Sequence, residues 1–137
     1  MPTVPRASNV DVIRAHYAAS DRGDLPGMLA PLGPKTTWTE AAGFPYAGTY
    51  TGPDEVREHV FEAIGRDWDG YRFTLGDLLD AGGTVIGVGT YTGTHRGTGR
   101  SFTARVAHLW RFEGGEVASF EQIVDSAPVV AALREQQ

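Results

Sequence analysis

The second half of the sequence is dominated by residues that alternate between apolar and polar types, interrupted by three short turns that contain glycine. A period of two is typical of half-buried strands, and turns this short connect antiparallel neighbours. The feature therefore predicts an antiparallel meander that forms most of the fold. Its strands are expected at residues 71–75, 84–93, 101–112 and 117–124.

The first half is predominantly helical. Apolar residues at helical spacing follow Ser8, a good N-cap, and Gly23 marks the end of that helix. Pro53 suits the first turn of a later helix, for which Gly65 is the expected end. We expect helices at residues 10–21, 24–29, 53–65 and at the C-terminus up to 133, with one strand at 36–40.

The expected order of elements is α-α-β-α-β-β-β-β-α, which is typical of the α+β class with helices preceding an antiparallel sheet. A length of 137 residues fits one domain, so residues 1–137 are expected to fold as a single unit. Residues 1–7 carry two prolines and are expected to form a flexible lead-in.

Composition excludes several classes of function. The absence of cysteine excludes disulfides, thiolate metal sites and cysteine nucleophiles. The net charge of −5 argues against nucleic acid as a partner. No apolar stretch approaches the length of a membrane span, and no secretory leader is visible, so we expect a cytoplasmic protein with no membrane partner. The four histidines lack metal-ligand spacing, and no phosphate-binding or dinucleotide motif is present, so we expect no metal and no cofactor.

Glu40 is the first candidate for chemistry. It shares a strand face with Trp38, and an aromatic side chain on a face favours an inward orientation. A carboxylate inside an apolar interior has its charged form disfavoured, so its pKa rises towards the range of a general acid or base. The alternative is a solvated Glu40, or one paired with an arginine.

His108 and Gln122 are the second and third candidates. His108 alternates with Trp110 on one strand face, and Gln122 alternates with Phe120 on the next strand. A histidine there can donate a hydrogen bond to a substrate oxygen, whereas a glutamine can orient a ligand but cannot transfer a proton. The alternative for His108 is a core histidine bonded to a backbone carbonyl. For Asp125, which precedes Ser-Ala-Pro, helix capping is favoured over chemistry.

Five segments of the sequence carry a resemblance to a known superfamily: Asp21-Arg-Gly-Asp-Leu, Trp38-Thr-Glu, Gly48-Thr-Tyr-Thr-Gly-Pro, Ala107-His-Leu-Trp-Arg-Phe-Glu-Gly-Gly-Glu-Val and Asp125-Ser-Ala. Together they resemble the NTF2-like superfamily, and within it the SnoaL-like and ketosteroid-isomerase-like proteins. The resemblance implies a curved antiparallel sheet wrapped around helices as a cone, with an apolar pocket inside and dimers formed through the outer sheet face. It covers nearly the whole chain but is weak for function, because this fold hosts enzymes and binding modules alike.

The resemblance also implies roles for single residues. Glu40 falls where ketosteroid isomerases carry a proton-abstracting aspartate. His108 falls where those isomerases place an acidic oxyanion donor and where SnoaL-like cyclases place a histidine. Gln122 occupies the position of an acid/base aspartate in SnoaL-like cyclases and in relatives of limonene epoxide hydrolase, and this departure counts against their mechanisms. His16 and Tyr17 lie near the tyrosine donor of the isomerases, with His16 in register.

We therefore favour a cofactor-free isomerase or cyclase that acts by acid–base catalysis on a polyketide-, terpenoid- or steroid-like oxygenated substrate. Glu40 and His108 are its predicted catalytic residues, and a homodimer through the outer sheet face is expected. The alternatives are an epoxide hydrolase or epoxide-opening cyclase, and a non-catalytic module for ligand binding or dimerisation. The predicted substrate-binding residues are Tyr17, Trp38, Tyr46, Phe73, Trp110, Phe120 and Gln122.

Overall fold

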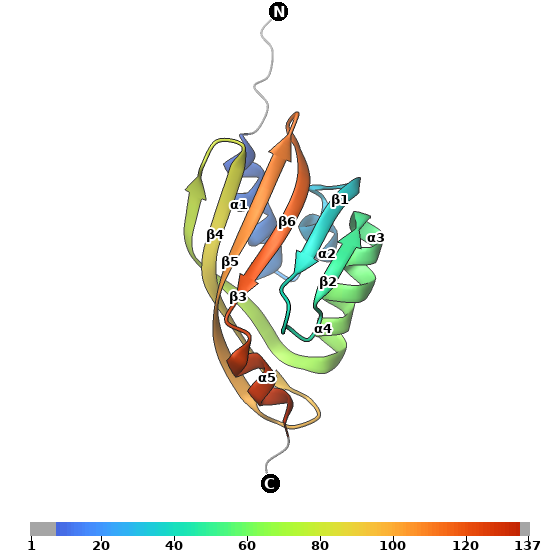
Figure 1. Ribbon diagram of the computed structural model, residues 1–137, viewed down its shortest axis with the longest axis vertical. Helices are drawn as coiled ribbons and strands as arrows, with labels where there is room; N and C mark the ends of the chain where they lie inside the picture. Colours follow the sequence, from blue (N-terminus) through green and yellow to red (C-terminus); the bar gives the residue numbers. More distant parts are fainter. Residues whose placement is uncertain (1–7, 135–137) are drawn as a thin grey trace, which may run out of the picture.

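The computed structural model describes residues 8–134, so the expected lead-in at residues 1–7 lies outside the described residues. Its centre is one six-stranded, strongly curved sheet with the strand order β2-β1-β6-β5-β4-β3 (Figure 1). The strands are β1 (Leu32–Glu40), β2 (Gly48–Thr51), β3 (Trp68–Asp80), β4 (Thr84–His95), β5 (Ser101–Glu113) and β6 (Glu116–Val124).

The predicted meander is confirmed, since β3, β4, β5 and β6 pair in sequence order and antiparallel. β3 is much longer than predicted because it pairs with β4 along its whole length, from Trp68 opposite His95 to Asp80 opposite Val85. β1 joins the other edge of the meander by pairing parallel to β6.

The two N-terminal helices are confirmed at the predicted positions. α1 (Asn9–Asp21) begins after Ser8, whose hydroxyl accepts a backbone N–H of the first turn at 3.2 Å. α2 (Leu25–Leu29) begins after Asp24, whose carboxylate accepts the N–H of Gly27 at 3.1 Å. Each cap satisfies an N–H that has no partner within its helix, which explains why the local sequence fixes both starts.

The third predicted helix is a continuous stretch of three parts: α3 (Gly52–Val56), a π-helical turn η1 (Arg57–Phe61) and α4 (Glu62–Asp67). The predicted end at Gly65 is wrong, because the helix continues to Asp67 and stops where β3 begins. The predicted order also lacked a strand: residues immediately before this helix form β2, which pairs antiparallel with β1.

The C-terminal helix α5 (Ala127–Leu133) follows β6. The capping role expected for Asp125 is wrong. Ser126 is the N-cap residue and makes no side-chain hydrogen bond there, while Asp125 is exposed and its backbone N–H donates to the Arg105 carbonyl at 3.0 Å. Asp125 thus continues the sheet pairing instead of opening the helix.

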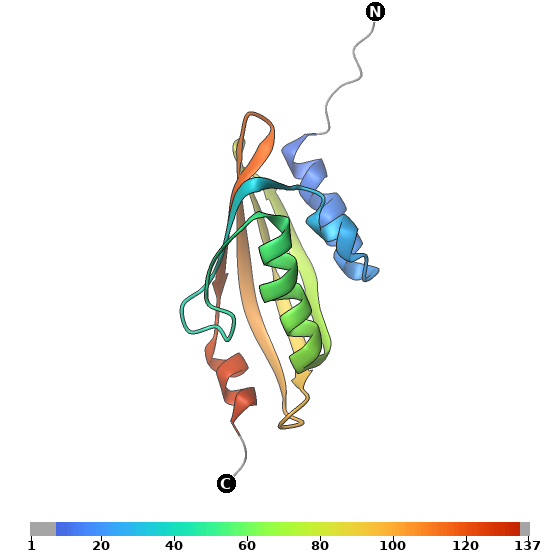
Figure 2. The same cartoon turned by 90° about the vertical axis from the view of Figure 1, so that its right-hand side faces the viewer.

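Helix α1 and the α3–η1–α4 helix lie against the same face of the curved sheet (Figure 2). The core lies between them, and the inner positions of β4 and β5 alternate strictly with outer ones. This arrangement confirms the predicted α+β class and the predicted curved sheet wrapped around helices.

Two glycines of β4 make room for the interior. A Cβ added at Gly87 would collide with the Tyr17 ring, and one at Gly89 would collide with the Phe73 ring and the Thr74 carbonyl oxygen. Any larger residue at either position would push these rings away from the sheet. The glycines therefore position side chains of the pocket described next.

Within residues 8–134, no helix has the length and apolar character needed to cross a membrane.

Candidate active site

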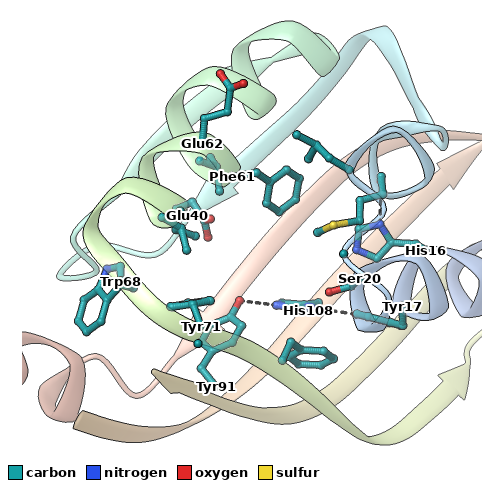
Figure 3. A pocket seen from close by; sticks show the side chains of 18 of the residues that line it. His16, Tyr17, Ser20, Glu40, Phe61, Glu62, Trp68, Tyr71, Tyr91 and His108 are labelled. Atoms are coloured by element: carbon teal, nitrogen blue, oxygen red, sulfur yellow. Dashed lines mark hydrogen bonds between the residues drawn. The ribbon is translucent and has the colours of Figure 1, made fainter. Parts of the chain in front are cut away.

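A cavity of about 510 Å³ lies between the inner face of the sheet and the helices. This is within the usual range for small-molecule sites. Apolar and aromatic side chains supply most of its wall, and Glu40 and His108 both face into it (Figure 3). Its polar side chains deep in the fold are His16, Tyr17, Glu40, Tyr71, Tyr91 and His108.

A hydrogen-bond chain crosses the floor of the cavity (Figure 3). His108 is at its centre, with Nδ1 2.8 Å from the Tyr17 hydroxyl and Nε2 2.6 Å from the Tyr91 hydroxyl. The Trp110 indole N–H donates to the Tyr17 oxygen at 3.0 Å. The Gln122 amide donates to the Tyr91 oxygen at 3.0 Å. Both ring nitrogens of His108 are therefore occupied by tyrosines rather than open to a ligand.

The tautomer of His108 determines which of the two tyrosine hydroxyls can donate its hydrogen to another group. Burial lowers the pKa of His108 to about 3, so the ring is neutral at physiological pH and has one N–H and one lone pair. One tyrosine donates to that lone pair, while the other accepts the ring N–H. The accepting tyrosine keeps its own hydroxyl hydrogen for another acceptor.

Gln122 is held in one orientation. The backbone N–H of Ala41, next to Glu40, donates to the Gln122 Oε1 at 3.0 Å, which turns the amide nitrogen towards Tyr91. Gln122 thus hydrogen-bonds Tyr91 and does not itself line the cavity. It also links β6 to the end of β1, the strand that carries the carboxylate.

Glu40 is 4% exposed and lies at the C-terminal end of β1. Burial raises the pKa of its carboxyl to about 8, and the nearby Trp38 indole opposes this rise in part. No arginine or lysine forms an ion pair with it among residues 8–134. The expected alternatives of a solvated or arginine-paired Glu40 do not describe this geometry.

Three buried polar atoms within the described part of the chain have no hydrogen-bond partner: Glu40 Oε2, the Tyr71 hydroxyl and Trp38 Nε1. All three residues line the cavity. Buried polar groups are normally paired, and leaving one unpaired costs about 1–3 kcal/mol.

His16, on α1, supplies a further polar edge of the cavity. Its Nδ1 lies 2.8 Å from the carbonyl oxygen of Met28. Its ring packs edge-on against Trp110, with centroids 4.7 Å apart. Burial lowers the pKa of His16 to about 4, with the Met28 hydrogen bond opposing this in part, so the ring is neutral at pH 7.

The structure divides the sequence-predicted binding residues into two groups. Tyr17, Trp38 and Phe73 line the cavity. The other four lie behind its wall. Trp110 and Gln122 hydrogen-bond the tyrosines, and Phe120 stacks on Trp38 with ring centroids 3.7 Å apart. The Tyr46 hydroxyl donates to Asp67 at 2.7 Å and accepts from the Trp68 indole at 3.0 Å.

Sequence reasoning missed Tyr71 and Tyr91. The parity of β4 gives the signal for Tyr91, since it shares a face with Val85 and the glycines at 87 and 89. No comparable signal identifies Tyr71, whose placement depends on how far β3 extends towards the α4 helix.

Among residues 8–134, no group of three or more histidines and carboxylates is placed to hold a metal ion. Asp125, the carboxylate that an epoxide-opening mechanism would recruit, is exposed. The buried titratable side chains that line the cavity are those of Glu40, two histidines and the tyrosines.

Comparison with known proteins agrees with this architecture. Residues 13–120 match the family model described as a SnoaL-like domain, so the chain belongs to the SnoaL-like family. A solved NTF2-like protein from Burkholderia thailandensis is 50% identical in sequence to this chain. The match covers 93% of this chain and 98% of the other, with a TM-score of 0.91.

An NTF2-like protein of unknown function from Burkholderia pseudomallei is 32% identical, with 92% and 98% of the two chains covered and a TM-score of 0.82. A protein with a ketosteroid-isomerase-like fold from Catenulispora acidiphila, solved in complex with trimethylamine, shares the fold at 20% identity, with 95% and 93% coverage and a TM-score of 0.75. No curated protein matches the sequence. Family and cavity together support a role in binding or converting a small molecule.

Proposed function

We propose that the chain is a cofactor-free isomerase or cyclase in which Glu40 transfers protons to and from an apolar, oxygenated substrate of polyketide, terpenoid or steroid type. The observation that carries the proposal is the buried Glu40 carboxyl, which belongs to a residue that lines the cavity beside the tyrosine network and forms no ion pair among residues 8–134. A pKa of about 8 leaves roughly a tenth of Glu40 ionised at pH 7, so proton transfer in either direction is accessible.

Tyr91 is the donor that would stabilise negative charge on the substrate oxygen. When the N–H of His108 points to Tyr91, the Tyr91 oxygen accepts from both His108 and Gln122, and its hydrogen is free to donate. Tyr91 and Glu40 both line the cavity, which supports this pairing of roles. In this scheme His108 positions Tyr91 and does not touch the substrate.

The experiment follows conversion of a β,γ-unsaturated cyclic ketone, the non-conjugated isomer of cyclohexenone, by the ultraviolet absorbance of the conjugated product. We expect Glu40→Gln to lose 10²-fold or more in kcat while remaining folded, since general acid–base catalysis contributes about 10²–10⁴-fold. Glu58→Gln, an exposed residue of η1, is the matched control. Full turnover by a folded Glu40→Gln variant would disprove the proposal.

A ligand-binding module without turnover is the second candidate, favoured by the aromatic wall of the cavity. It predicts retention of an aromatic ligand with no conversion at any pH. Epoxide opening is disfavoured, because it requires a second interior carboxylate and Asp125 is exposed.

Assembly as a single-domain cytoplasmic homodimer through the outer face of the sheet is part of the same proposal. Ile123 is 53% exposed on that face, beside the Arg111–Glu121 ion pair of 3.0 Å. Sedimentation of the wild type and of Ile123→Glu tests this, with dissociation expected only in the variant.

A further inference from the structure

We propose that His16 is a second proton-transfer residue of this site, with its Nε2 taking a proton from the substrate while the Glu40 carboxyl delivers one from the opposite side. The inference rests on the proposed function and adds a base that the mechanism above does not use. In Figure 3 the two side chains lie on opposite sides of the cavity, with Phe61 and His108 on its other walls.

Geometry fixes the tautomer of His16. A carbonyl oxygen can only accept, so the 2.8 Å contact with Met28 requires the hydrogen to be on Nδ1. A neutral ring then carries its lone pair on Nε2, and no partner for Nε2 is found among residues 8–134. The ring is held edge-on to Tyr17 and Trp110, with centroids 5.1 and 4.7 Å away, and it lines the cavity. His16 is thus a positioned acceptor without a protein donor.

The surroundings allow an uncharged acid and an uncharged base to coexist. Arg96 and Glu62 are exposed, and Arg96 is bound to Asp69 at 2.9 Å. The interior therefore offers His16 no fixed charge, and burial holds its pKa at about 4 while raising that of Glu40 to about 8. Pairs of groups driven apart in this way are the usual acid and base of a site. The titratable or charged groups that line the cavity with His16 are Tyr17, Glu40, Glu62, Tyr71, Tyr91, Arg96 and His108.

The step balances without a co-reactant. The Nε2 lone pair takes a proton from a substrate carbon next to a carbonyl, and the C–H electron pair becomes the C=C bond of an enol. The carbonyl π pair moves to oxygen, which takes the proton of the Glu40 carboxyl. In the reverse sense, the Glu40 carboxylate removes the O–H proton and the His16 imidazolium protonates a different carbon, so both residues return to their starting states and the double bond has moved.

This arrangement specifies the substrate class. The ligand needs an acidic C–H or O–H at the His16 end and a carbonyl or hydroxyl oxygen at the Glu40 end, joined by a flat apolar body that fits between the aromatic walls. A cyclic enone or its non-conjugated isomer meets these requirements.

The first experiment is the pH profile of kcat for the same β,γ-unsaturated cyclic ketone. Because the reactive form has neutral His16 and protonated Glu40, the rate should fall below about pH 4 and above about pH 8. If Glu40 were the base by itself, the rate would instead rise through pH 8. His16→Asn keeps an amide N–H for the Met28 carbonyl but has no basic nitrogen, and we expect it to lose at least 10²-fold in kcat. His59→Asn, on the exposed face of η1, is the matched control.

The second experiment needs no turnover. Side-chain nitrogen NMR of the wild-type protein should show the Nδ1–H tautomer of His16 at pH 7, and titration with naphthol as the probe should shift the His16 Nε2 resonance as the phenol donates to it. His16→Asn should weaken naphthol binding at least fivefold, whereas His59→Asn should not.

The outcomes separate the two proposals. Normal kcat in His16→Asn together with loss in Glu40→Gln overturns the role of His16 and leaves the proposed function intact. Normal kcat in both variants overturns both. If the wild type converts none of the ketone, an unmoved Nε2 resonance or unchanged naphthol affinity in His16→Asn overturns the inference by itself, and a moved resonance with weakened binding supports it.

Discussion

Replacing Glu40 by glutamine should stabilise the protein, and the gain should grow with pH. The carboxyl has a pKa of about 8 in the folded protein against an ordinary value of 4.5, because burial penalises the carboxylate. The folded state therefore binds its proton more tightly than the unfolded state does. The stability that Glu40 contributes is fully present below about pH 4.5 and is lost as the pH rises through 8. Glutamine has nearly the same shape and does not ionise.

The magnitude follows from linkage. Each pKa unit corresponds to about 1.4 kcal/mol. We take the free energy of unfolding of Glu40→Gln minus that of the wild type, and compare this difference with its value at pH 4. The difference should be larger by ~3 kcal/mol at pH 7 and by ~5 kcal/mol at pH 9. The shift between the pKa values of 4.5 and about 8 sets this scale. Such a change is a large fraction of the stability of an ordinary domain.

The assay is urea denaturation followed by tryptophan fluorescence, for wild type, Glu40→Gln and the exposed control Glu58→Gln at several pH values from 4 to 9. Titration of the buried histidines affects wild type and variant alike, so the difference between them isolates Glu40. Parallel stability curves for wild type and Glu40→Gln across this range would refute the argument that Glu40 is buried without a compensating charge.

Two further predictions concern the interior. Gly87→Ala should lower the free energy of unfolding by about 1–3 kcal/mol, because its Cβ collides with the Tyr17 ring; thermal melts measure this, and an unchanged Tm would contradict the close approach. When the pH is lowered from 7 to 4, the free energy of unfolding of His16→Asn should rise by roughly 3 kcal/mol relative to that of the wild type. Burial lowers the pKa of His16 from 6.5 to about 4, so its folded form resists the protonation that the unfolded chain accepts; equal losses on acidification would contradict this.

Local sequence determined the parts of the fold that local interactions stabilise. Ser8 and Asp24 cap their helices with their own side chains, so the starts of α1 and α2 could be predicted closely. Strand parity likewise placed Glu40 and His108 inside, because alternate residues of a strand face opposite sides.

Other features depend on partners far along the chain. β2 is a strand because β1 pairs with it. Its threonines and tyrosine favour a strand, but a stretch of 4 residues is too short for that preference to identify one by itself. The occupation of both His108 nitrogens could not be predicted either, because Tyr17 is 91 residues away and Tyr91 is 17 residues away. Whether a polar side chain meets a ligand or another side chain is decided by such distant pairs.

The parallel pairing of β1 with β6 has a consequence for how the protein is made. The backbone of Ala41 and the side chain of Gln122 bond across 81 residues of sequence, and β6 is the last strand to leave the ribosome. Contacts between residues so far apart in sequence form slowly, because the entropy cost of closing a long loop comes before the contact can stabilise the fold. We expect the nascent helices and the β3–β4–β5 hairpins to form first, because their contacts are closer in sequence. β6 must therefore be made before β1 can complete its pairing around Glu40, and a fragment that ends before β6 lacks Gln122 and this pairing.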